Sequence, residues 1–123
     1  MEALKDTVKK MLESGTDIPV FYQRAGKDAK YPYFVFEFRR LSENSGIEQF
    51  VLEVNGWDQH PTSSRIEKKM DELEAVIHTL KHNNSDRVVV IYKGTKSPVD
   101  DEDKSIKRCR EQFEMQVCER RQA

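Results

Sequence analysis

The chain has 123 residues and a formal net charge of −1, with 37% hydrophobic and 35% charged residues. This length predicts a single domain over residues 1–123 with one modest core. The near-zero net charge provides no overall attraction to nucleic acid or to an anionic membrane. The sequence has no apolar run of about 18 residues, which a transmembrane helix requires, and residues 1–15 lack the pattern of a signal peptide.

The first predicted elements are a helix and a short strand. Leu4 and Leu12, with the apolar residues between them, lie on one face of a helix that we expect to end at Gly15. Residues 18–25 predict a short strand. Pro19, at its second position, places this strand at a sheet edge or marks its first residues.

Two segments with strict alternation follow and predict a hairpin. In the first, Phe34, Phe36 and Phe38 point to one side, and residues 48–57 repeat the alternation. The Asn-Ser-Gly segment at 44–46 is typical of a turn, so the two strands are predicted to pair antiparallel. Each strand has an unbroken apolar row on one face, and we expect the next helix to cover it.

That helix is predicted over residues 64–80. Ser64 and Glu67 have the spacing of a capping box, with Thr62 and Ser63 as alternative caps. Its apolar residues recur at intervals of three and four, which is typical of an amphipathic helix packed on a sheet. This stripe consists of Ile66, Met70, Leu73, Ile77 and Leu80.

The last part of the chain predicts two more strands around a polar loop. Residues 87–94 form an apolar strand, and residues 107–118 alternate and are expected to pair with it. Between them we expect a long acidic loop over 94–105 that stays disordered in the free monomer. The predicted fold is therefore α+β, in the order α-β-β-β-α-β-β, with a mainly antiparallel sheet packed against two helices.

No arrangement of residues is typical of catalysis, so we expect neither an enzyme nor a cofactor. A Gly-rich phosphate loop and a nucleophile elbow are both absent. His78 and His82 have a spacing on the predicted helix that suits a metal, but no third ligand accompanies them, which favours a capping or surface role. The carboxylates at 100–103 are a possible divalent-ion site, although a solvated charge run is the simpler interpretation.

The two cysteines are not expected to form a disulfide. Cys109 and Cys118 lie on one predicted strand, which separates them by roughly 30 Å. A disulfide requires Cα atoms within about 7 Å of each other. Two reduced thiols suit folding in a cytoplasm.

Nucleic-acid binding is an alternative function. An aromatic strand flanked by Arg39 and Arg40 is similar to the RNA-recognition sheet, in which exposed aromatic side chains stack on bases. That fold places a helix between its first two strands, whereas three strands follow one another here. The alternative also requires Phe34 and Phe36 to be exposed, because covered rings cannot stack on bases.

The order of these features resembles the tail-terminator family of long-tailed bacteriophages, also called tail-completion or head–tail joining proteins. The resemblance covers nearly the whole chain and depends on order and spacing. Its parts are Tyr31-Pro32-Tyr33 before the strand Phe34–Phe38, the strand end Val54-Asn55-Gly56-Trp57-Asp58, the capped helix Thr62–Leu80, the strand Arg87–Tyr92, the acidic segment Asp100–Asp103 and the basic alternating strand Lys107–Val117.

The resemblance implies a structural virion protein. It would form a ring, commonly a hexamer, that caps the finished tail tube and joins the tail to the head connector. Its partners would be further copies of itself, the tail tube protein and a head connector or completion protein, with no membrane and no specific nucleic acid. It would fold in the host cytoplasm and reside in the virion at the head–tail interface. A neighbouring head-completion or minor capsid component is the alternative within this class.

Charged groups that meet across subunit contacts are the candidate interface residues of such a ring, with one tryptophan as an anchor. They are Arg39, Arg40, Trp57, Asp100, Asp101, Glu102, Asp103, Lys107, Arg108 and Arg110.

Overall fold

The structure is a computed structural model and describes residues 2–77, 81–83, 87–99, 101 and 103–119. The α+β class and the predicted order of elements are confirmed, and one short strand, β4, is added after the second helix. Neither of the described helices is long and apolar enough to cross a membrane. The elements are α1 (Glu2–Glu13), β1 (Val20–Tyr22), β2 (Tyr33–Asn44), β3 (Ile47–Gln59), α2 (Ser64–Ile77), β4 (Lys81–Asn83), β5 (Arg87–Val99) and β6 (Ile106–Glu119).

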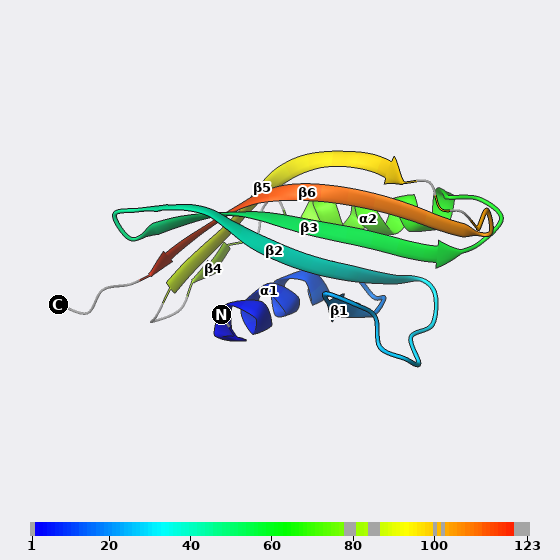
Figure 1. The fold of residues 1–123 in the computed structure, drawn as a ribbon, viewed down its shortest axis with the longest axis horizontal. Coiled ribbons are helices and arrows are strands. Elements are labelled where there is room, and N and C mark those ends of the chain that lie inside the picture. Colours follow the sequence, from blue (N-terminus) through cyan, green and yellow to red (C-terminus); the bar gives the residue numbers. More distant parts are fainter. Residues whose placement is uncertain (1, 78–80, 84–86, 100, 102, 120–123) are drawn as a thin grey trace.

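The strands form one sheet of 6 strands in the order β1-β2-β3-β6-β5-β4. The β1–β2 pair is parallel, and the other pairs are antiparallel. The predicted hairpin is formed by β2 and β3, with Ser45 and Gly46 at positive φ in its turn. The predicted pairing of the last strand with residues 87–94 is also confirmed, and β6 lies between β3 and β5 (Figure 1).

The two faces of the sheet differ, because both helices lie on the same side (Figure 1). Alternate residues of β3 point to the helices, and of these Phe50, Leu52 and Val54 are buried. Phe34 and Phe36 of β2 are fully buried on this core face, as predicted. We call the other side of the sheet, which neither α1 nor α2 covers, the open face.

The prediction that the second helix covers the β2 phenylalanines is wrong in part. α2 packs against β3, β5 and β6, whereas α1 contacts β1 and α2. Phe36 and Phe38 instead contact the ring of Tyr22 in β1, at 5.2 and 5.8 Å between centroids. The reason is that β6 and β5 extend the sheet beyond β3, and α2 packs over these three strands and not over β2. β1 and α1 pack beside β2 instead.

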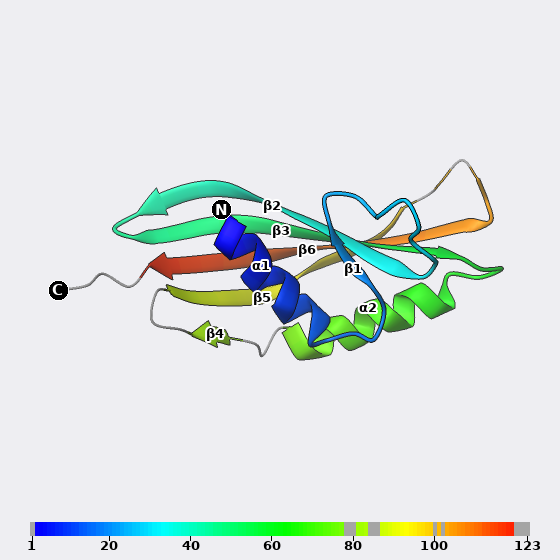
Figure 2. The same cartoon turned by 90° about the horizontal axis from the view of Figure 1, so that it is seen from below.

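The sheet is strongly twisted along its strands. At the hairpin end of Figure 1 β2 lies above β6, whereas at the opposite end it lies below β6, and Figure 2 shows the same reversal after a turn of 90°. A twist of one hand is normal for sheets and accumulates along long strands. The open face is therefore turned toward different sides of the molecule at its two ends.

The predicted acidic loop over 94–105 is too long. β5 continues through its polar residues to Val99, paired with β6 as far as Arg108. Its register shifts between Tyr92 and Thr95, and there a Cβ on Gly94 would lie 1.3 Å from the carbonyl oxygen of Gln112. Backbone pairing with β6 thus stabilises a strand whose side chains alone indicated a loop.

Two details of the predicted second helix also change. The carbonyl of Ser63 accepts the amide hydrogen of Glu67 at 3.0 Å, so Ser63, one of the alternative caps, is the N-cap. His82 belongs to β4, so the predicted helical pair of histidines is not formed. The other partner, His78, and Leu80 lie outside the described residues.

Candidate functional site

The open face carries a tryptophan and an arginine near the end of β3. Trp57 lies opposite Tyr33 of β2 and opposite Arg108 of β6 in the strand register, so the three side chains project from the same face. The guanidinium carbon of Arg108 lies 3.9 Å from the centroid of a Trp57 ring, which is a cation–π contact. Both side chains are half-buried.

Further aromatic rings extend this group along β2. The Tyr33 ring stacks on Tyr31 at 5.3 Å and meets Phe21 of β1 edge-on at 5.8 Å. Partial burial, together with the neighbouring Tyr31, raises the pKa of the Tyr33 hydroxyl. Phe21, Tyr31, Tyr33 and Trp57 thus form a row of rings at one end of the open face, which we call the aromatic shelf. With Arg108 it offers apolar area and a cation to a partner.

Beside the shelf lies a hollow of 230 Å³, lined by residues that include Val35, Asn55, Arg108 and Arg110. The side-chain oxygen of Asn55 and the Nε of Arg108 are shielded from solvent and have no hydrogen-bond partner among the described residues. Such groups are normally satisfied in folded proteins. Arg110, in contrast, lies 3.6 Å from a carboxylate oxygen of Glu53. The hollow therefore retains one unused donor and one unused acceptor.

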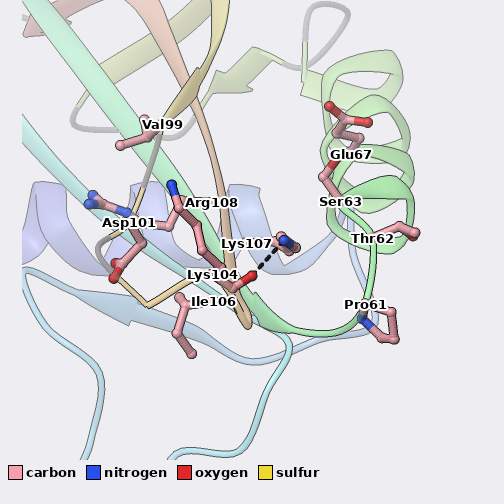
Figure 3. A pocket seen from close by; sticks show the side chains of 10 residues that line it. All are labelled: Pro61, Thr62, Ser63, Glu67, Val99, Asp101, Lys104, Ile106, Lys107 and Arg108. Carbon is pink, nitrogen blue, oxygen red and sulfur yellow. Dashed lines mark hydrogen bonds between the residues drawn. The ribbon is translucent and has the colours of Figure 1, made fainter.

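Arg108 also lines a second pocket, of 380 Å³, at the same end of the molecule (Figure 3). The first turn of α2 forms one wall, with Ser63 and Glu67, and residues of β6 and its preceding turn face it. Lys107 is held there, because its ammonium donates to the carbonyl of Lys104 at 2.6 Å. Both acidic and basic groups line the pocket, so it does not select a ligand of a single charge.

An ion pair between an exposed arginine and a buried carboxylate holds α2 beside this pocket. Asp58, at the end of β3, is fully buried, and both of its carboxylate oxygens accept hydrogen bonds from Arg65 in the first turn of α2, at 2.8 and 2.5 Å. This bidentate geometry is the strongest form of arginine–carboxylate contact. The pair fixes the start of the helix relative to the strand that carries Trp57.

The acidic turn between β5 and β6 is organised by its own residues. Asp103 accepts hydrogen bonds from the amide and hydroxyl of Ser105, at 2.9 and 2.7 Å, and these bonds lower the pKa of its carboxyl. Asp101 accepts the amide hydrogen of Asp103 at 3.1 Å. Asp100 and Glu102, the other two predicted acidic residues, lie outside the described residues.

The structure brings some of the predicted site residues together and separates others. Trp57, Arg108 and Arg110 meet at the shelf, with Lys107 and Asp101 around the adjoining pocket. Arg39 is exposed on the same face but near the middle of the sheet, opposite Val51. Arg40 points to the other face, 3.3 Å from a carboxylate oxygen of Glu48.

Sequence reasoning did not identify Asn55 or the tyrosines of the shelf as parts of a site. A signal for Asn55 exists in the sequence, because Asn55 and Trp57 alternate with the buried residues of the same strand. The tyrosines have no comparable signal. Their positions next to Phe21 and Trp57 depend on which strands pair.

No metal centre is built from the residues that the structure places. In this part of the chain no group of three or more His, Cys, Asp or Glu side chains is arranged to hold a metal ion. Cys109 and Cys118 are both on β6, and neither forms a disulfide. Burial, reinforced by the negative charge of Glu67, raises the pKa of the Cys109 thiol to about 11.

No protein-family model matches the chain, and no curated protein sequence matches it. The interpretation of the shelf therefore depends on the residues of this chain.

Proposed function

We propose that the protein is a structural component of a long-tailed bacteriophage, which forms a ring on the end of the tail tube and joins the tail to the head connector. The observation that carries the proposal is the order of features along the chain, from Tyr31-Pro32-Tyr33 through Trp57 to the basic alternating strand of β6, which resembles the tail-terminator family. The α+β fold is compatible with this resemblance.

The aromatic shelf supports a role in protein contacts. Aromatic and arginine side chains dominate the binding energy of protein interfaces, and here Trp57, Tyr33 and Arg108 lie together on a face that neither helix covers. A ring built from identical copies requires two different surfaces on each copy, so that the contact closes on itself. The partners in this proposal are further copies of the chain, the tail tube protein and the head connector.

Deletion of the gene from its phage tests this function. We expect tails of irregular, excessive length that do not attach to heads, as seen by electron microscopy, and restoration of normal particles by the gene in trans. Normal, head-attached tails in the deletion phage would show that the protein is not a tail terminator. Normal tails with unattached or unfinished heads would instead favour the neighbouring head-completion role.

Nucleic-acid binding remains the second candidate, but with different aromatic residues as the stacking groups. Phe34 and Phe36 are buried and are not available to stack on bases, whereas Tyr31, Tyr33 and Trp57 are partly accessible beside Arg108 and Arg110. Titration of Trp57 fluorescence with single-stranded DNA at low and high salt distinguishes the candidates. Tight, salt-dependent quenching that Arg108→Ala weakens favours nucleic acid, and an unchanged signal favours the protein-contact role.

A further inference from the structure

We infer that neighbouring copies of this chain join head to tail, with the tip of the β2–β3 hairpin of one copy seated on the aromatic shelf and Arg108 of the next. This inference rests on the proposed ring, because it names the surfaces by which the copies associate. The hairpin tip is here residues 41–48.

The hairpin tip presents exposed apolar side chains far from the core. Leu41 is 57% exposed and Ile47 is 42% exposed, and they are the only large aliphatic residues with such exposure in the described part of the chain. Scattered exposed apolar residues are common, but here both lie in the tip of one hairpin. Ile47 has the same strand parity as Trp57, so it projects from the open face.

The tip carries carboxylates, whereas Arg108 beside the shelf is a cation. Between residues 41 and 48 the tip contains Glu43 and Glu48 and no basic residue. Glu48 is paired with Arg40, whereas Glu43 contacts the amide of Gly46 at 3.0 Å and forms no ion pair with another described residue. At the shelf, Arg108 likewise has no acidic partner in the residues that the structure describes, and its Nε has no hydrogen-bond partner among them. Glu43 lies opposite Glu48 in the register, on the other side of the hairpin from Ile47, and its carboxylate is held at the turn by Gly46. The end of the hairpin therefore supplies the anion that Arg108 of the next copy lacks.

The tip also supplies the hydrogen-bonding groups that the hollow requires. Asn44 and Ser45 are exposed at the turn, with side chains that both donate and accept. The unsatisfied oxygen of Asn55 needs a donor, and the Nε of Arg108 needs an acceptor. A carboxamide or a turn peptide group provides both at once.

The shape of the sheet makes a head-to-tail contact feasible and an intramolecular one impossible. The hairpin tip and the shelf lie at opposite ends of the long axis, since β3 begins at Ile47 and carries Trp57 near its other end (Figure 1). The twist turns the open face to different sides at these two ends (Figure 2). One copy displaced along the long axis thus brings the end of its hairpin to the shelf of its neighbour. Two different surfaces in contact form a heterologous interface, which closes into a ring when the rotation permits.

Chemical cross-linking tests the contact directly. In a Cys118→Ser background, which removes the exposed thiol, the double variant Glu43→Cys and Arg108→Cys is treated at high concentration with a short bis-maleimide. We expect a ladder of dimers, trimers and larger species that ends at the size of the closed ring. The matched control replaces Glu43→Cys by Lys68→Cys, an exposed position on α2, and is expected to give no ladder.

Charge reversal provides a second measurement that does not depend on cross-linking. We expect Glu43→Arg and Arg108→Glu each to weaken self-association by about tenfold or more in sedimentation experiments, and the two together to restore it. Leu41→Asp, at an exposed position that the fold does not need, is expected to abolish association while leaving the unfolding midpoint unchanged.

The outcomes separate this contact from the proposed function. A product that stops at the dimer means a two-fold contact and overturns the head-to-tail arrangement. The wild-type chain could also form rings although the double-cysteine variant gives no ladder and the double charge reversal does not restore association. In that case the hairpin tip does not occupy the shelf, and the inference is wrong. A wild-type chain that remains monomeric up to its solubility limit, together with a double-cysteine variant that gives no ladder, also overturns the contact. None of these results bears on tail length in the deletion phage, which tests the function itself.

Discussion

Gly56 is the position at which the packing of α2 on the sheet can be tested most directly. It lies on the core face of β3, where an added Cβ would be 2.7 Å from Cγ1 and 2.8 Å from Cδ1 of Ile66, and 3.1 Å from Cε1 of Phe34. Carbon atoms in favourable contact are about 3.5–4.0 Å apart. Gly56→Ala therefore forces Ile66 off its rotamer or moves the first turn of α2 away from the sheet.

The magnitude follows from two opposing effects. Overpacking of a core costs about 1–3 kcal/mol, whereas a Gly→Ala change stabilises through the unfolded chain by about 0.4–1 kcal/mol. The net loss in the free energy of unfolding is therefore roughly 1–2 kcal/mol. With a urea m-value of about 1–3 kcal/mol/M, the unfolding midpoint, followed by Trp57 fluorescence, should fall by roughly 1 M.

A double-mutant cycle with Ile66→Ala refines the test. Ile66→Ala alone is expected to cost about 2–5 kcal/mol, but it removes the two atoms that an alanine at position 56 would meet. The double variant should therefore be more stable than the sum of the single losses predicts, by roughly 1 kcal/mol. Additivity within about 0.5 kcal/mol would refute the close approach. Gly26→Ala is the matched control, since its nearest contact is an ordinary 3.6 Å to Phe21.

The remaining predictions concern β5, the aromatic strand and the buried thiol. Gly94→Ala places a methyl group against the backbone of Gln112 and should cost more than about 3 kcal/mol or prevent folding; a normal urea midpoint would contradict the close pairing of β5 and β6. Phe36→Ala should lower the free energy of unfolding by about 3–5 kcal/mol, and a loss of less than about 1 kcal/mol would contradict its burial. The pKa of Cys109 is about 11 in the folded chain against an ordinary 9.0, so the unfolded thiol ionises first and stability falls as pH rises through this interval. Wild type should lose roughly 1–2 kcal/mol more than Cys109→Ala between pH 8 and 10, and equal pH slopes would disprove the shift.

The sequence by itself determined the elements whose signal is local. Alternation placed Phe34 and Phe36 on the buried face of a strand, the Asn-Ser-Gly segment gave the hairpin turn, and the stripe that includes Ile66 gave the second helix. These features depend on side-chain period and on backbone preferences over a few residues, so a single sequence contains them. Trp57 and Arg108 were also named as candidate interface residues, but on the basis of the ring that the family resemblance implies.

Only the tertiary structure decided how these elements meet. β6 pairs with β3 as well as β5, and this long-range register places Arg108 over Trp57 and leaves Asn55 beside them. The same pairing extends β5 through polar residues to Val99, where composition alone indicated a loop. Strand pairing is set by backbone hydrogen bonds and a shared core between segments distant in the chain, and no local pattern encodes that choice. For this reason the sequence identified Trp57 and Arg108 singly, whereas their assembly with the tyrosines into one surface is a property of the fold.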